Sequence, residues 1–474
     1  MTGLLPYAPA ALGVAGAIIA MAFDAWQLRR AALVGGVVLL VAGALAAGLS
    51  AATPVVGDLV MSGGRFSVAA AACLGLGAVA LLACGRSLSA DRAGSRLVAL
   101  GALAASSSAL VAAAYDVGVL FLGVEALALC GYAMVAVADT DRAREAAMKW
   151  FIQGSIATVV FVVGVAVLMG RTGGSLGYTQ IGAFATSAVD VPMALGFVLI
   201  LSALAFKIGA FPMHSWMPDA YETASPSAAA ILSSAGKVGP LVAVVWLSMG
   251  VIGAAGARVL FVVAVLAACS IVFGNLAALR QRSLARMLAY SGIAQVGYAL
   301  VGVPLGADAP VVLVFAILYG LTAAASFVLV QALHEADRTW DGTIRGLAGL
   351  SRRSPALAVS LAVIMFSLTG IPLTAGFWGK FLVFAGASVG GYLWLAIVGV
   401  LGSVVSFGYY GAAIRSAYID EPATPDEEPA GEQVGSGRLG MAGSSAGVLA
   451  ILIVVAGVAP MVWGYQGVLG ALLR

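Results

Sequence analysis

The sequence predicts an all-α polytopic membrane protein with about 14 transmembrane helices, arranged as two inverted five-helix repeats that each contain a broken helix. The first observation is composition: 62% of the 474 residues are hydrophobic and only 9% are charged, with a mean hydropathy of +1.06. Soluble globular domains are not built this way. The second is that the apolar residues form long runs. The third is that proline or glycine interrupts two of these runs near a lysine.

Apolar runs of about 20 residues, the length that crosses a bilayer, recur along the whole chain. The chain also has 61 glycines, and small residues let membrane helices pack closely against one another. We therefore expect 14 spans, at residues 4–25, 31–53, 67–85, 97–114, 116–138, 149–170, 191–218, 227–250, 257–279, 286–304, 309–333, 355–385, 390–414 and 441–468.

The basic residues predict the orientation of these spans. With the amino terminus outside, 17 of the 24 Lys and Arg residues fall on the inside, and only Arg65, Arg171, Arg258 and Arg474 fall outside. Such an excess on the inside is the rule for short loops, so both termini are expected outside. Two inside segments are expected without regular structure: the loop 139–149, and the acidic, proline-rich loop 420–437, which we expect to be disordered.

Two of the expected spans are interrupted. Pro212 lies within the span 191–218, and Gly370–Pro372 lies within the span 355–385; proline removes a backbone donor and breaks or kinks a helix. The two breaks are five spans apart, and because five is odd, a second copy would insert upside down, as in secondary transporters. We expect one membrane domain over residues 1–474, made of amino-terminal helices (1–96), a first repeat (97–250), a second, inverted repeat (257–414) and a last helix (441–468).

Three of the four lysines lie inside apolar runs: Lys207 and Lys380 near the breaks, and Lys237 in the run after the first break. Glu125 is the carboxylate expected deep in the span 116–138. Charged groups in a bilayer are costly, face the bundle interior or a water-filled path, and mark routes for ions or protons. Burial penalises the ammonium form, so a lysine can release and regain a proton where an arginine keeps its own.

An ion pair between Glu125 and Lys207 would be a switch for that proton. At a separation of ~4 Å and an effective dielectric constant of ~20 the attraction is about 4 kcal/mol. The alternative is that each lysine is a paired structural charge or extends to the membrane interface.

His214, in the polar turn after the first break, either extends a proton path or caps a carbonyl. Asp219 and Glu222 are expected at the inside surface, solvated or at a helix end.

Other functional classes find no support. The four cysteines, Cys73, Cys84, Cys130 and Cys269, stand singly without the C-x-x-C spacing of metal or cluster sites. A G-x-G-x-x-A match at 75–80 lies within a membrane run rather than between a strand and a helix, so it does not indicate dinucleotide binding. A formal charge of +3 and the lack of a basic, aromatic cluster argue against nucleic acid. No cofactor is expected in this chain.

Several segments in order resemble one family. They are GVEALALCGYAM (123–134), EAAMKWFIQGSIA (145–157), KIGAFPMHSWMPDAYE (207–222), AGKVG (235–239), GNLAALRQRSLARMLAYSGIAQVGYALVG (274–302) and SLTGIPLTAGFWGKF (367–381). Together they resemble subunit N of bacterial NADH-quinone oxidoreductase (respiratory complex I), an antiporter-like proton-pumping subunit. The resemblance extends from about Asp116 to Tyr418. The sequence departs from the family pattern at Met213, where the family has phenylalanine, and in a weaker proline-rich turn after the first break.

The resemblance implies 14 helices with two inverted repeats. It also implies a proton path in which Glu125 and Lys207 form a coupled pair, Lys237 is the central relay and Lys380 is the exit group. Quinone and NADH would be used by other subunits, because this chain has no flavin, iron-sulfur or nucleotide motif. The implied partners are the other membrane subunits, the peripheral redox arm, the lipid bilayer and protons, in a bacterial cell (inner or plasma) membrane.

Two alternatives remain open at this point. One is a subunit of a multisubunit cation/proton antiporter, related in fold but driven by ion exchange; neighbouring genes for electron-transfer subunits or for small antiporter subunits would separate the two. The other is a passive membrane anchor of a redox complex whose buried charges are structural. That alternative predicts that Lys207→Met and Lys380→Met leave pumping intact.

Overall fold

The computed structural model describes residues 6–50, 55–56, 60–91, 93–187, 191–249, 257–308, 311–421 and 441–463. Helices account for nearly all of this part of the chain, with one short antiparallel pair of strands, β1 (Val55–Val56) and β2 (Met61–Ser62). The helices are α1 (Ala8–Ala25), α2 (Arg29–Ser50), α3 (Gly64–Ala83), α4 (Gly85–Ala90), α5 (Gly94–Ala113), α6 (Val117–Ala136), α7 (Asp141–Thr172), α8 (Tyr178–Ser187), α9 (Val191–Ile208), α10 (Trp216–Thr223), α11 (Pro226–Ser233), α12 (Ala235–Leu247), α14 (Ala257–Ala278), α15 (Leu284–Leu300), α16 (Val311–Ala336), α17 (Leu350–Arg353), α18 (Pro355–Thr369), α19 (Ala375–Val389), α20 (Leu393–Tyr418) and α21 (Met441–Trp463), with 3₁₀ turns η3 (Val303–Asp308) and η4 (Arg345–Leu347).

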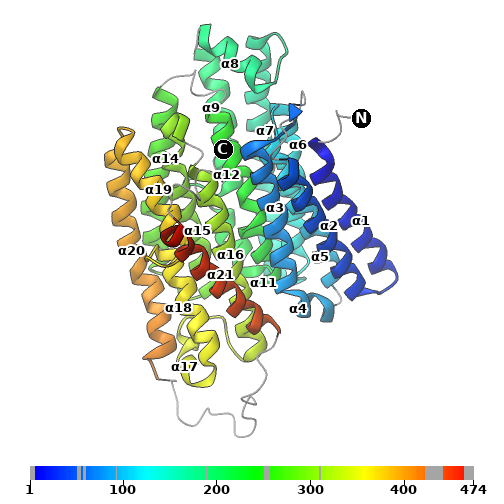
Figure 1. Ribbon diagram of the computed structural model, residues 1–474, viewed down its shortest axis with the longest axis vertical. Coiled ribbons are helices and arrows are strands. Elements are labelled where there is room, and N and C mark those ends of the chain that lie inside the picture. Colours follow the sequence, from blue (N-terminus) through cyan, green and yellow to red (C-terminus); the bar gives the residue numbers. More distant parts are fainter. Residues whose placement is uncertain are drawn as a thin grey trace.

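The helices form a bundle in which chain order runs across the molecule (Figure 1). The blue helices α1, α2 and α5 lie at one edge and the orange helix α20 at the other, while α21 crosses the second half obliquely. Helices α11 and α12 lie between the halves, because they contact α3 and α5 on one side and α16 on the other. They are buried along nearly their whole length. The middle of the bundle is therefore where groups from both halves can meet.

The predicted spans are confirmed. Thirteen helices of the described residues are long and apolar enough to cross a membrane, counting α11 and α12 as one. Two shorter apolar helices, α18 and α19, together fill the expected broken span 355–385. Outer helices such as α2, α7 and α20 expose many large apolar side chains, as helices facing lipid do.

Both predicted breaks are present. Helix α9 ends at Ile208 and α10 begins at Trp216, with a turn between them that contains Pro212. Helix α18 ends at Thr369, and α19 begins at Ala375. In each half the broken helix is the fourth of five consecutive spans. The repeat boundaries at 97–250 and 257–414 stay a prediction.

Two expectations need correction. The segment 139–149 is not a loop, because α7 begins at Asp141, with Thr140 capping its first turn through a bond from the backbone N–H of Ala143. The span 227–250 is divided at Ser234, whose backbone (φ −103°, ψ −95°) leaves the helical region and separates α11 from α12. The acidic loop at 420–437 lies almost entirely outside the described residues.

The arrangement of the ends agrees with the charge pattern. Helices α4 and α17, which contain Arg86, Arg352 and Arg353, lie at one end of the bundle, and α8 lies at the other (Figure 1). Which end faces the inside of a membrane stays a prediction.

The G-x-G-x-x-A match lies in α3, where a Cβ on Gly77 would come within 2.6 Å of Ala105 Cβ on α5, so glycine there serves close helix packing.

Candidate functional site

The first cluster of buried charges lies where α9 breaks. Lys207 occupies the last turn of α9, and its Nζ is 2.9 Å from Oε1 of Glu125 on α6. The lysine side chain is 8% exposed and the glutamate 24%, so the pair is largely removed from solvent. The hydroxyl of Thr158 of α7 lies 2.9 Å from the same carboxylate oxygen and 2.9 Å from Gly154 O, so its one hydrogen has two acceptors within reach. The structure thus brings together the two residues predicted to pair, and adds a threonine that the sequence did not single out.

A cavity of about 30 Å³ joins this pair to Lys237. Space of that size holds one or two water molecules. Lys207 and Lys237 both line it, together with Trp150, Trp216 and Tyr221.

Lys237 itself lies in the first turn of α12, immediately after the break at Ser234. It is 2% exposed. Its Nζ is 2.9 Å from Met217 Sδ and 5.6 Å from the centre of the Tyr221 ring, both on α10. A thioether and an aromatic face stabilise an ammonium more weakly than a carboxylate does, and none of the ion pairs found in the described residues involves Lys237.

Lys380 has a different environment. It lies in α19, and its Nζ donates two hydrogen bonds of 2.9 Å to the carbonyl oxygens of Leu368 and Thr369, the last residues of α18. The ammonium also lies 4.3 Å from the centre of the Tyr298 ring. Gly370 makes this approach possible: its φ of +92° ends α18, and a Cβ there would come within 2.9 Å of Lys380 Cδ.

Polar side chains continue between Lys237 and Lys380. Gln295 Nε2 donates 2.8 Å to Leu368 O, the carbonyl that also accepts from Lys380. A Cβ on Gly292 would lie 3.4 Å from Lys237 Nζ and 3.3 Å from the Tyr319 hydroxyl, so these two groups are neighbours. A second cavity of about 10 Å³, near the minimum that one water needs, is lined by Gln295, Tyr319, Thr322, Ser367 and Leu368.

A buried hydrogen-bonded network supports this second half of the site. The side-chain amide of Asn275 donates a hydrogen bond of 3.0 Å to the Tyr298 hydroxyl and accepts one of 3.0 Å from the Tyr409 hydroxyl. The hydroxyls of Ser291 and Tyr410 are also hydrogen-bonded to each other. These residues come from α14, α15 and α20, so the network fixes the ring that covers Lys380.

His214 lies in the turn after the first break. Its ring stacks on Phe211 with ring centres 5.5 Å apart and lies tilted by 53° against Phe273 of α14, at 4.4 Å. The ring contacts found for the histidine are thus aromatic rather than with a lysine. Its part in a proton path stays a prediction.

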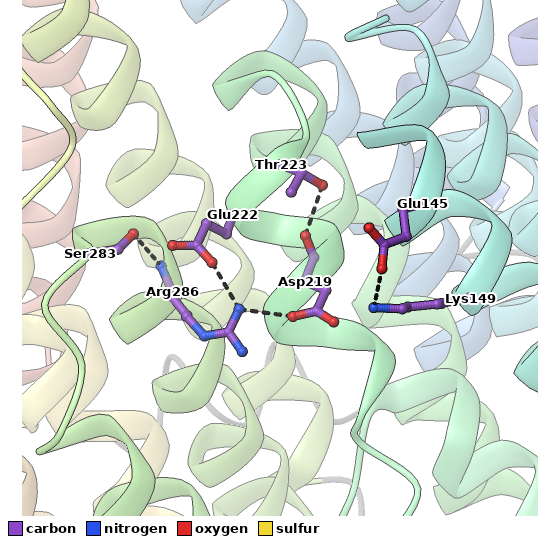
Figure 2. Close-up of polar contacts among 7 residues, drawn as sticks. All are labelled: Glu145, Lys149, Asp219, Glu222, Thr223, Ser283 and Arg286. Atoms are coloured by element: carbon purple, nitrogen blue, oxygen red, sulfur yellow. Dashed lines mark hydrogen bonds and ion pairs between the residues drawn. The ribbon is translucent and has the colours of Figure 1, made fainter. Parts of the chain in front are cut away.

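The structure adds an ion-paired cluster that the sequence did not predict. Arg286, in the first turn of α15, places Nη1 2.8 Å from Asp219 Oδ1 and 2.8 Å from Glu222 Oε2, both on α10 (Figure 2). Asp219 and Glu222 were expected as solvated or capping residues. They are partly exposed, and Asp219 lies in the first turn of α10, as expected; in addition, both are counter-ions of Arg286 and tie α10 to α15.

Metal chemistry finds no ligands in the part of the chain that the structure describes, since no three His, Cys, Asp or Glu side chains gather there. The cysteines are free and mostly buried, as Cys73, Cys84 and Cys130 show. What the site offers is a row of buried lysines with two small cavities between them, the first lined by Lys207 and Lys237 and the second by Gln295 and Tyr319.

A polytopic bundle with ionisable groups at broken helices defines a class, the ion-translocating membrane proteins. The family model described as NADH:quinone oxidoreductase/Mrp antiporter, TM matches residues 114–406. The chain belongs to this family, and the resemblance seen in its sequence motifs is confirmed.

Curated relatives and solved structures agree. The chain is 38% identical over 331 residues to NADH-quinone oxidoreductase subunit N of Alkalilimnicola ehrlichii, covering 69% of this chain and 67% of the relative. It is 34% identical over 366 residues to subunit N of Hirschia baltica, covering 76% and 75%. A chain of respiratory complex I from Thermus thermophilus with bound aureothin superposes with a TM-score of 0.78 at 26% identity, covering 97% of this chain and 98% of that one. A chain of the Mrp complex from Dietzia sp. shares the fold, with a TM-score of 0.82 at 19% identity and coverage of 100% and 99%.

Proposed function

We propose that this chain is the proton-translocating subunit N of an NADH-quinone oxidoreductase, coupling quinone reduction by partner subunits to proton pumping. The observation that carries the proposal is the Glu125–Lys207 ion pair at a helix break, joined to Lys237 through a shared cavity. The subunit-N relatives, similar over about 70% of this chain, support the same assignment.

In the proposed mechanism the ion pair is the switch. At 2.9 Å and an effective dielectric constant of ~20, the attraction is about 6 kcal/mol. Separating Glu125 from Lys207 removes that stabilisation, so Lys207 releases its proton toward Lys237. Moving one charge through 100 mV takes about 2.3 kcal/mol. The attraction that Lys207 loses when the pair opens is larger than this, so the change in its proton affinity is large enough for one such step. Lys237 then passes a proton by way of the second cavity to Lys380, the exit group.

The electron transfer belongs to other subunits in this proposal. Quinone and NADH bind elsewhere in the complex, and this chain contributes no redox centre and no cofactor. Its partners are the neighbouring membrane subunits, the peripheral redox arm and the lipid of the bacterial plasma membrane. The complex is an oxidoreductase, and this chain is its translocating part.

A cation/proton antiporter subunit is the second candidate, because the matching family includes Mrp antiporters and the Dietzia Mrp chain has the same fold. Genes for electron-transfer subunits beside this one favour the first proposal, and genes for small antiporter subunits favour the second. A passive anchor is the third, and it is tested by the experiment below.

The test removes the charges of the Glu125–Lys207 pair one at a time, and its control breaks an exposed ion pair in the same way. Glu125→Gln and Lys207→Met complexes are expected to lose proton translocation together with coupled quinone reduction, while NADH oxidation with an artificial acceptor continues. The control variants Arg415→Met and Asp420→Asn break an ion pair of 3.4 Å at the end of α20, where the side chains are 68% and 38% exposed, and should pump normally. Full pumping by assembled Glu125→Gln and Lys207→Met complexes would leave the passive anchor as the better account.

A further inference from the structure

The helix that follows the first break is short and depends on its contacts with neighbouring helices. Helix α10 spans eight residues between the turn after α9 and the cap at Ser225, and isolated helices of that length are unstable. Its first residue, Trp216, stacks on Trp150 of α7 with ring centres 4.1 Å apart, and its Nε1 donates 2.9 Å to Phe206 O. These contacts fix the beginning of α10, Tyr221 packs edge-on against Phe327 of α16, and the partly exposed side of the helix has a polar attachment.

Arg286 supplies that attachment. Asp219 and Glu222 are three residues apart, so both point from the same side of α10, and Arg286 Nη1 lies 2.8 Å from each (Figure 2). The arginine comes from the first turn of α15, which Ser283 caps by accepting the Arg286 backbone N–H at 3.3 Å. The three side chains are about one third exposed, which places the cluster at the rim of the buried region. Charge-assisted hydrogen bonds of this kind are stronger than neutral ones.

The other side of α10 touches the central lysine. Met217 and Tyr221, one turn apart, both contact the Lys237 ammonium. Helix α15 reaches the same place, because a Cβ on Gly292 would be 3.4 Å from Lys237 Nζ and 3.4 Å from Met217 Cε. The two helices that Arg286 joins are therefore both among those that cover Lys237.

We infer that Arg286, acting through Asp219 and Glu222, is a positioning residue that holds α10 against α15 and so keeps Met217 and Tyr221 on the Lys237 ammonium. Without the guanidinium, two carboxylates on neighbouring positions of α10 repel each other with no counter-ion between them. The side of α10 that carries these carboxylates then shifts away from α15, and Lys237 loses its contacts with Met217 and Tyr221 beside the cavity that it lines. This inference rests on the proposed function, since its consequence is measured as proton translocation.

The experiment compares three variants in the assembled complex. Arg286→Met should lower proton translocation about tenfold while NADH oxidation with an artificial acceptor is unchanged. Arg286→Lys, which keeps the positive charge, should recover most of the loss. The exchanged pair Arg286→Glu with Glu222→Arg restores opposite charges across the same two helices and should recover it as well.

A second measurement follows α10 directly. Ala220 is fully buried on this helix, so a cysteine placed there by Ala220→Cys should react slowly with a membrane-permeant maleimide, and several-fold faster when combined with Arg286→Met. Lost translocation with unchanged labelling would overturn a positioning role. So would full translocation by an assembled Arg286→Met complex.

The outcomes separate this inference from the function beneath it. If Lys207→Met pumps fully, the proposed function fails whatever Arg286 does. If Lys207→Met stops pumping while Arg286→Met does not, only the positioning role fails. Should Arg286→Met fail to assemble, the exchanged pair decides: an assembled complex that pumps supports the inference, and an assembled complex that does not pump overturns it.

Discussion

The two broken helices share a plan but hold their lysines differently. At the first break Lys207 belongs to the half-helix before the turn and pairs with the carboxylate of Glu125. At the second break Lys380 belongs to the half-helix after the turn and binds the carbonyls of Leu368 and Thr369 that end the half-helix before it. Among the ion pairs found in the described chain, none involves Lys380, so its counter-charge is the negative end of a helix dipole.

Lys207 therefore has a partner that can move, and Lys380 has partners that are fixed. A carboxylate can move away by a side-chain rotation, which turns the attraction on Lys207 off and on. Backbone carbonyls at a helix end move only with the whole helix, so the attraction on Lys380 stays nearly constant. The first break is thus suited to respond to a signal, and the second to receive a proton and release it on one side.

The comparison predicts its largest effect at Lys380. Lys380→Arg keeps the positive charge and donors for Leu368 O and Thr369 O, but an arginine does not release its proton. We expect both Lys380→Met and Lys380→Arg to reduce proton uptake by inverted membrane vesicles by at least about a hundredfold, a barrier increase of about 2.7 kcal/mol.

The arginine variant is the informative one. Near-normal pumping by Lys380→Arg would mean that a fixed positive charge is enough at the second break, and the exit role of Lys380 would have to be abandoned. The amount of assembled complex, measured in the same membranes, controls for misfolding.

The next effect concerns stability at the first break. Glu125→Gln leaves a buried ammonium without its counter-ion, which costs about 3 kcal/mol. The double variant with Lys207→Met removes both charges, so it should be more stable than Glu125→Gln alone. Lys380→Met should destabilise less than Glu125→Gln, because it strands no charge. The temperature at which the subunit leaves the detergent-solubilised complex measures all three variants. A double variant less stable than Glu125→Gln alone would contradict the pairing argument.

The sequence predicted the breaks and the buried lysines because both depend on local chemistry. Proline at 212 and the Gly370–Pro372 segment interrupt helices by backbone geometry alone, and a lysine in an apolar run must find a partner wherever the chain folds. The pairing of Glu125 with Lys207 could be predicted because deep carboxylates are rare in this sequence.

The remaining features depend on tertiary contacts. No proline marks the break at Ser234, whose hydroxyl bonds instead to Ala230 O one turn earlier. Arg286 reads as one of many inside basic residues, and only the folded chain brings it to Asp219. The carbonyl partners of Lys380 have no side-chain signature at all. The loop expected at 139–149 was wrong because Thr140 and Asp141 are good residues for starting a helix.

A smaller effect is expected at Tyr298, where two variants distinguish the contribution of the aromatic ring to pumping from that of the hydroxyl. Tyr298→Phe keeps the aromatic face 4.3 Å from Lys380 Nζ and loses the hydrogen bond from Asn275, at a cost of about 1 kcal/mol. Tyr298→Leu also removes the cation–π contact, about 2 kcal/mol when desolvated. Pumping should be near normal with phenylalanine and several-fold lower with leucine. Equal losses in both would assign the effect to the hydroxyl network instead.

The smallest expected effect is at Thr158, and it asks how finely the first break is adjusted. Its hydroxyl lies 2.9 Å from Glu125 Oε1 and from Gly154 O. When Lys207 moves away, a hydrogen bond from this hydroxyl to Glu125 stabilises the carboxylate. Thr158→Val keeps the shape and removes the donor, so the open state should lose about 1 kcal/mol and pumping should slow about fivefold. Thr158→Ser, which keeps the hydroxyl, is the matched control and should pump at nearly the normal rate. If the Thr158→Val and Thr158→Ser variants take up protons into vesicles at the same rate, the opening of the ion pair depends on Glu125 and Lys207 alone.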